Sequence, residues 1–159
     1  MLIIQLILYC LIFTCIVKTA VIGGAVNGLY FYPRPVQDRA IEIGLTTRES
    51  MKKRSKIFMS AFYIIMLVSL VLIIGLWNQV SDFKTAYLQA LLFLLVMNWY
   101  DGIVIDKVWV GHSSFWILPG LENMPFTKSW GDMFKKRIIL SLIWVVGAAL
   151  VAGLVVLIF

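Results

Sequence analysis

Three polar side chains lie inside an apolar segment of the chain, residues 86–105: Gln89, Asn98 and Asp101. A carboxylate at the centre of a bilayer costs about 2.5–3.5 kcal/mol, so such a residue is expected to have a function or a partner. Asn98 and Asp101 are three residues apart and share a helix face, which predicts a hydrogen bond between them. The alternative to a functional role for Asp101 is a structural hydrogen bond or ion pair with another span.

Asp106 and Lys18 are the next candidates for a polar site. Asp106 follows Asp101 by five residues, so on an α-helix it is turned about 140° away from it. It is expected at the membrane boundary, beside Lys107. Lys18 is expected to extend its amine to the membrane surface. Alternatively, it pairs with Asp101 at the same end of the bilayer.

Two further candidates lie in the loop after this segment. His112 is the single histidine, and histidine is the side chain most suited to proton exchange near neutral pH. Together with Glu122, Asp101 and Asp106 it could supply oxygen and nitrogen ligands for Mg²⁺ or Mn²⁺ beside a lipid phosphate. The spacing of the four matches no metal signature, so we predict no metal, no cofactor and no assigned catalytic residue.

The elements that position these residues are predicted to be membrane helices. Of the 159 residues, 62% are hydrophobic and 14% are charged, which is too apolar for a soluble domain of this size. Four apolar segments predict an all-α, single-domain polytopic membrane protein with spans at about 2–31, 58–77, 86–105 and 138–159. The first would be about 45 Å long as one helix. It must therefore tilt, project from the membrane or break near Gly23–Gly24.

Charge predicts the orientation in a cell membrane. Seven basic residues lie in loop 33–57 and five in loop 106–137, whereas connection 78–85 has only Lys84. The two basic loops are therefore expected in the cytoplasm and both termini outside. A net charge of +6 that flanks apolar spans indicates contact with the anionic lipid bilayer, not with nucleic acid.

Both long loops have structure predicted within them. Val36, Ala40, Ile41 and Ile43 form one apolar face, which predicts a short interfacial helix ending at Gly44. The loop 107–137 is long and rich in aromatic residues, which places it in the headgroup layer. Two stripes of small residues predict close helix packing or contacts in a homo-oligomer or with a partner subunit. These are Ala20, Gly24 and Gly28, and Ala148, Ala149, Ala152 and Gly153.

The segments NWYDGIVIDKVWVGH, WILPGLENMPF and YPRPVQDRAIEIGLT resemble a group of small four-span bacterial membrane proteins of unassigned activity. The resemblance implies a bacterial cytoplasmic membrane and brings no substrate or site residue.

The leading functional hypothesis is a non-enzymatic membrane protein. It would bind or help to translocate a small or amphipathic ligand, with Asp101 and Asn98 as the polar site and loop 107–137 as a cytoplasmic lid. The first alternative is an enzyme acting on a lipid or isoprenoid at the cytoplasmic face, with Asp101, Asp106, His112 and Glu122 as acid, base or metal ligands. The second is an accessory subunit whose polar residues only fix helix packing.

Overall fold

The computed structural model describes residues 1–124, 126–127 and 129–159, and all regular elements among them are helices. Lys128, one of the five basic residues counted in loop 106–137, lies outside the described residues. The elements are α1 (Leu2–Ala20), η1 (Ala25–Phe31), α2 (Arg34–Glu42), α3 (Arg48–Val71), η2 (Leu72–Trp77), α4 (Phe83–Tyr100), η3 (Asp101–Trp109), α5 (Val110–His112), η4 (Ser114–Trp116) and α6 (Trp130–Ile158).

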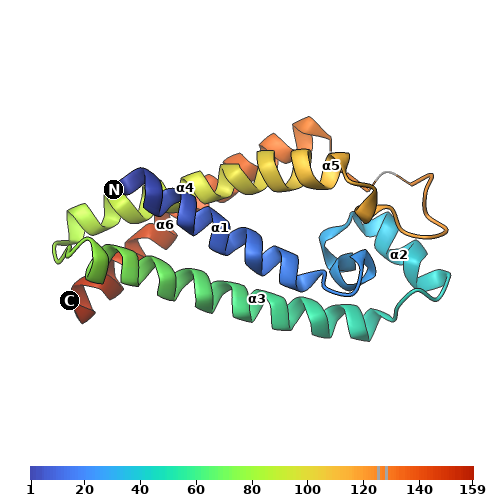
Figure 1. Ribbon diagram of the computed structural model, residues 1–159, viewed down its shortest axis with the longest axis horizontal. Coiled ribbons are helices and arrows are strands. Elements are labelled where there is room, and N and C mark those ends of the chain that lie inside the picture. The colour runs from blue at the N-terminus through green and yellow to red at the C-terminus, as the bar shows by residue number, and fades with distance from the viewer. Residues whose placement is uncertain (125, 128) are drawn as a thin grey trace.

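Four helical stretches of the described chain are long and apolar enough to cross a membrane: Leu2–Ala20, Arg48–Trp77, Phe83–His112 and Trp130–Ile158. They run side by side along the long axis of the molecule (Figure 1). Both termini and the short α3–α4 connection lie at one end, which we call the termini end. The two longer connections lie at the opposite end, the loop end. The predicted all-α architecture with four apolar helices is confirmed.

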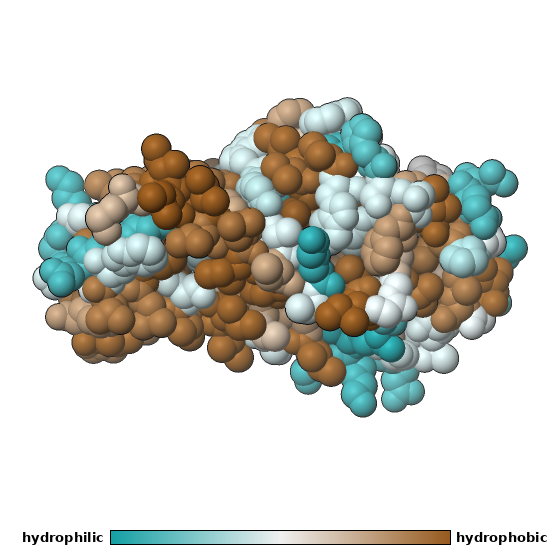
Figure 2. Space-filling view, viewed as in Figure 1, coloured by the Kyte–Doolittle hydropathy of each residue, from teal (hydrophilic) through white to brown (hydrophobic). Residues whose placement is uncertain are grey.

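The surface of this bundle is unusually apolar for a molecule in water. Many large hydrophobic side chains are exposed on all four long helices, among them Ile3, Ile64, Leu88 and Leu142. Figure 2 shows hydrophobic side chains over much of one face, most continuously over the half nearer the termini end, with hydrophilic side chains at the tip of that end and scattered over the loop-end half. This distribution is compatible with a multi-pass membrane protein, in which lipid tails cover the apolar band.

The first span is not one long helix. α1 ends at Ala20, and the backbone then passes through Gly23 (φ 88°) and Gly24 (φ 124°). These are conformations that only glycine adopts without strain. A 3₁₀-helix, η1, follows the break. Of the three alternatives for this segment, the structure therefore contains the break. The predicted stripe of Ala20, Gly24 and Gly28 is wrong, because no continuous helix joins these residues.

The break folds the chain back into a second hydrophobic core at the loop end. Val36 and Ala40 of α2 are buried there with Leu29, Tyr32 and Trp116. The Tyr32 hydroxyl donates a hydrogen bond to the carbonyl of Trp116 at 2.8 Å. Two residues of the predicted apolar face, Val36 and Ala40, thus pack against the protein itself, whereas Ile43 is exposed. The aromatic loop contributes Trp116, Leu118 and Leu121 to the same core.

Two residues of the predicted stripe on α6, Ala148 and Ala152, pack closely, whereas Gly153 is exposed. Ala148 and Ala152 are fully buried in the main core of the bundle, together with Phe93 and Ile74. α6 packs against α4 more extensively than any other pair of elements in the described chain. Side chains as small as alanine allow the two backbones to approach. This pairing brings the start of α6 beside the end of α4, where the predicted polar residues lie.

Candidate functional site

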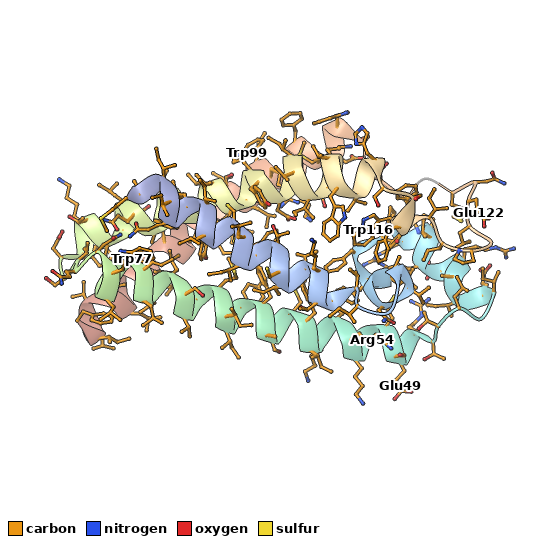
Figure 3. The ribbon with its side chains drawn as sticks, viewed as in Figure 1. Glu49, Arg54, Trp77, Trp99, Trp116 and Glu122 are labelled. Carbon is orange, nitrogen blue, oxygen red and sulfur yellow. The ribbon has the colours of Figure 1, made fainter. Side chains whose placement is uncertain are left out.

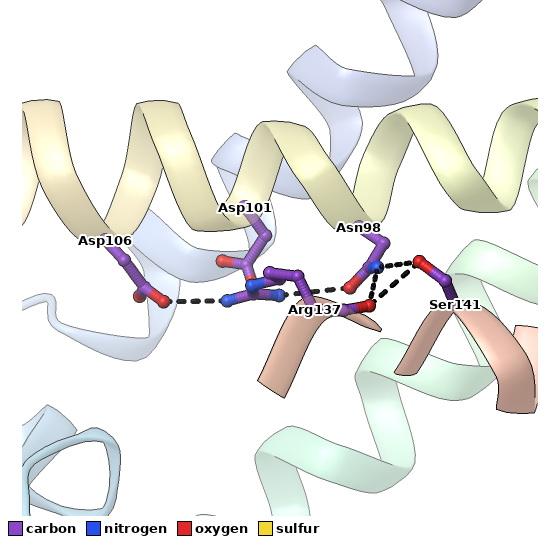
Figure 4. Close-up of polar contacts among 5 residues, drawn as sticks. All are labelled: Asn98, Asp101, Asp106, Arg137 and Ser141. Carbon is purple, nitrogen blue, oxygen red and sulfur yellow. Dashed lines mark hydrogen bonds and ion pairs between the residues drawn. The ribbon is translucent and has the colours of Figure 1, made fainter. Parts of the chain in front are cut away.

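The centre of the polar site is Arg137, a residue assigned from the sequence to the loop before the fourth span. α6 begins earlier than predicted, at Trp130, because the Ser129 hydroxyl accepts a hydrogen bond from the backbone N–H of Asp132 at 3.1 Å and caps the helix. Arg137 is therefore about two turns inside α6. Its side chain is only 2% exposed, and it points from α6 towards the end of α4 (Figure 4).

Two carboxylates share this guanidinium. The Nη1 atom of Arg137 lies 2.6 Å from Oδ2 of Asp101, and Nη2 donates to Oδ2 of Asp106 at 2.7 Å. Both are charge-assisted contacts, which are shorter and stronger than neutral hydrogen bonds. The carboxylate side chains are 25% and 31% exposed, so the network is buried on the arginine side and partly open on the other.

The expectation that Asp106 turns away from Asp101 is wrong, and the helix type is the reason. Residues Asp101–Trp109 form a π-helix, η3, directly after α4. In a π-helix the backbone bonds link residues five apart, so residues i and i+5 lie almost above one another. Asp101 and Asp106 have this spacing. The wider turn therefore places both carboxylates on the face that meets Arg137.

Asn98 belongs to the same network but with a different partner from the one predicted. Its side-chain amide donates to the Arg137 carbonyl at 2.9 Å and to the Ser141 hydroxyl at 3.0 Å. Its oxygen accepts from Nη1 of Arg137 at 3.3 Å. Asn98 therefore connects α4 to α6, whereas a bond to Asp101 within its own helix had been expected. Asn98 is itself buried.

Gly102 allows the arginine to lie so close to η3. A Cβ atom at this position would be 2.8 Å from Nε of Arg137 and 2.9 Å from the sulfur of Met133. Any larger residue would push the arginine away from the carboxylates. Nε has no hydrogen-bond partner among the described residues, since it faces the glycine backbone.

The charges around Arg137 are close to balanced. Asp101 and Asp106 bring two negative charges, and Arg137 brings one positive charge. Lys136, the preceding residue, adds a second positive charge that acts on Asp101. A site with balanced charge has little affinity left for a free cation. The arrangement is suited to holding η3 and α4 against α6.

The remaining predicted site residues are held elsewhere. The Lys18 amine lies over the ring of Trp109, 6.0 Å from its centre. Asp101, its alternative predicted partner, is paired with Arg137 instead. His112 contacts the backbone carbonyls of Lys107 and Val108 through Nδ1. Glu122 accepts a hydrogen bond from the Gly120 N–H at 2.9 Å.

Glu122 is an exposed acid. Hydrogen bonds from its own backbone N–H and that of Gly120 hold the pKa of the Glu122 carboxyl below its usual range. It is therefore charged at neutral pH and poorly suited to donate a proton. In the part of the chain that the structure describes, no three His, Cys, Asp or Glu residues gather as metal ligands. The four residues of the enzyme alternative are thus not brought together as a ligand set.

A second polar cluster, not predicted from the sequence as a group, lies at the termini end. Asn78 joins Gln5 and Gln89. The Gln5 amide donates to Oδ1 of Asn78 at 2.6 Å, and the Asn78 amide donates to Oε1 of Gln89 at 2.8 Å. Gln5 is 1% exposed, so its amide depends on this partner. Gln89, singled out among the polar residues of the third span, is explained by this structural role.

Replacing Asn78 with alanine should lower the free energy of unfolding by about 1–3 kcal/mol, because the buried amide of Gln5 loses its partner. Thermal unfolding of the purified protein in detergent, followed by circular dichroism, measures the change. The double variant Asn78→Ala/Gln5→Leu is the control, since it removes the unpaired amide and should regain part of the loss. An Asn78→Ala variant as stable as the parent would contradict this account.

No protein-family model, curated protein or solved structure matches this chain.

Proposed function

We propose that this protein is a non-enzymatic integral membrane protein that binds an amphipathic ligand at its loop end, on the cytoplasmic side of the membrane. The observation that carries the proposal is a groove of about 280 Å³ between the end of α1, η1 and the first half of α3. The groove has polar side chains at one end and apolar side chains along its length. A ligand with a polar head and an apolar tail matches both parts.

The apolar part of the groove follows one stripe of α3. Ile57, Phe58, Ala61 and Ile65 line it. At about 100° per residue their directions fall within about 100° around the helix, so they lie on a single face. Ile16 of α1 lies across from them. The polar part contains Thr19, Asn27 and Arg54, contributed by three different elements. Such a site exists only when α1, η1 and α3 are packed together.

The network around Arg137 does not contact the ligand in this proposal and has a structural role. It ties the third helix to α6 through two carboxylates and one amide. We assign it to holding the bundle together, so that α1 and α3 keep the groove open. The same network favours a second candidate function, an accessory subunit of a membrane complex. In that case its polar residues fix helix packing and the groove receives no specific ligand.

Filling the groove tests the proposal. Ala61→Trp should block it, because the indole would occupy the space between α1 and α3. The measurement is crosslinking of photoactivatable phospholipids, zwitterionic and anionic, to the full-length protein in bilayer nanodiscs, with labelled peptides identified by mass spectrometry. We expect labelling of the α3 segment 57–65 in the parent and loss of most of it in Ala61→Trp.

Met59→Trp is the matched control. It adds the same side chain to the same helix, about 200° around from Ala61, at an exposed position outside the groove. Labelling of segment 57–65 should persist in this variant. Uniform labelling of all apolar helix faces in the parent, unchanged by Ala61→Trp, would indicate bulk lipid only and would overturn the proposed function in favour of the accessory role.

A further inference from the structure

We infer that the groove takes an anionic phospholipid, with its phosphate on Arg54 and an acyl chain along the α3 stripe. This inference rests on the proposed function and adds the chemical class of the ligand.

The position of Arg54 carries the first step. Arg54 is exposed at the rim of the groove, on the loop-end part of α3 (Figure 3). It takes no part in the ion pairs of Arg39, Arg48 and Arg137 that the structure describes. Arg48, six residues earlier, is by contrast paired with Asp38 at 2.7 Å. A guanidinium without an acidic partner is suited to hold a phosphate through two parallel hydrogen bonds.

The length of the stripe carries the second step. From Arg54 to Ile65 the helix rises about 16 Å at 1.5 Å per residue. One leaflet contributes about 15 Å to the hydrocarbon core of a bilayer. The arginine therefore lies at headgroup level when the apolar residues below it extend through one leaflet. A lipid that enters from this leaflet meets the polar and apolar parts of the groove in the right order.

The third step is the positive charge around Arg54, which favours an anionic headgroup. Between residues 48 and 57 the chain has five basic residues and one acid, Glu49. The basic residues are Arg48, Lys52, Lys53, Arg54 and Lys56. Basic residues next to a membrane attract anionic lipids, and each adds to the attraction. A zwitterionic headgroup gains less from this field, since its own amine opposes it.

The apolar part of the groove decides between a lipid and a soluble phosphate. Ile16, Ile57, Phe58 and Ile65 offer contacts that only an acyl chain can use. A phosphorylated metabolite would leave this surface uncovered. The lipid is therefore the occupant we commit to.

The test compares two lipids on the intact protein. The protein in detergent micelles is titrated with phosphatidylglycerol or with phosphatidylcholine of the same acyl chains, and bound lipid is counted by native mass spectrometry. We expect phosphatidylglycerol to bind more tightly in the parent. Arg54→Gln should weaken it about tenfold, the effect of losing one charge-assisted contact. Arg54 and the control position Lys56 are both exposed, and unchanged melting temperatures verify that the variants fold.

Lys56→Gln is the matched control. It removes the same charge from the same helix two residues further on, about 200° around from Arg54. We expect less than about a twofold change, because only the general surface charge is altered. Equal losses in Arg54→Gln and Lys56→Gln would overturn the inference, since no specific phosphate site would then exist.

Two other outcomes separate the inference from the proposed function. Equal binding of both lipids, still blocked by Ala61→Trp, would overturn the anionic preference and leave the amphipathic ligand in place. If the parent protein bound neither lipid at the groove, both the inference and the proposed function would be overturned. Competition with glycerol 3-phosphate tests whether the ligand is a soluble phosphate. If it displaced phosphatidylglycerol completely at equal concentration, the ligand would be a soluble phosphate and the lipid assignment would be wrong.

Discussion

Replacing Arg137 with methionine should lower the free energy of unfolding by about 3–5 kcal/mol, the largest effect that we expect for a single substitution in this protein. Methionine has a similar volume, so little packing is lost. The substitution leaves Asp101 and Asp106 side by side on η3 without the guanidinium that now lies 2.6 and 2.7 Å from their oxygens. The measurement is a denaturation titration with sodium dodecyl sulfate in mixed micelles, followed by circular dichroism.

The triple variant Arg137→Met/Asp101→Asn/Asp106→Asn is the control for this result. It removes the whole set of charges, and replacing a complete buried ion-pair network is often close to neutral. Most of the lost stability should therefore return. If the triple variant were as unstable as Arg137→Met alone, the unpaired carboxylates would not be the cause, and the arginine would act mainly through its packing.

Gly102→Ala should be the second largest effect at this site, with a loss of about 1–3 kcal/mol through overpacking. The new methyl group would lie 2.8 Å from Nε of Arg137 and 2.9 Å from the sulfur of Met133. Both neighbours must shift, and the arginine can shift only by lengthening its contacts with the carboxylates. The same titration measures the change.

Gly153→Ala is the matched control for Gly102→Ala. Gly153 lies within α6, and nothing lies within 4 Å of a Cβ atom built there. Alanine favours a helix over glycine by up to about 1 kcal/mol, so this variant should be unchanged or slightly more stable. A Gly102→Ala variant as stable as Gly153→Ala would show that Arg137 has room to move, which contradicts the close packing described above.

The two acids of the third span show how far sequence reasoning reaches. Asp101 was identified because a carboxylate in an apolar segment needs a purpose or a partner, and the structure supplies an ion pair with another span. The partner itself was missed. Arg137 follows Lys135 and Lys136, so it reads as the end of a basic loop. One available signal was charge balance, since an acid near the end of the third span needs a basic residue at the same depth in the membrane.

The π-helical conformation of η3 could not be predicted from hydrophobic periodicity. Hydrophobic spacing in residues 101–109 does not separate an α-helix from a π-helix, because the apolar residues are too frequent to favour one period. We attribute the choice to tertiary contacts. Only the wider turn lets Asp101 and Asp106 both reach Arg137. The gain from two charge-assisted contacts offsets the poorer backbone geometry of the π-helix.

The amino-acid composition and the order of apolar and basic segments by themselves determined an all-helical chain with four helices able to cross a membrane. The free energy of transferring apolar side chains out of water is roughly additive along the chain, so it can be judged from the sequence without a structure. Only the tertiary structure decided that the first span breaks near Gly23 and Gly24, that α2 and the aromatic loop form a second core, and that the groove beside Arg54 exists. The second core and the groove depend on contacts between residues far apart in the sequence, which no local pattern encodes.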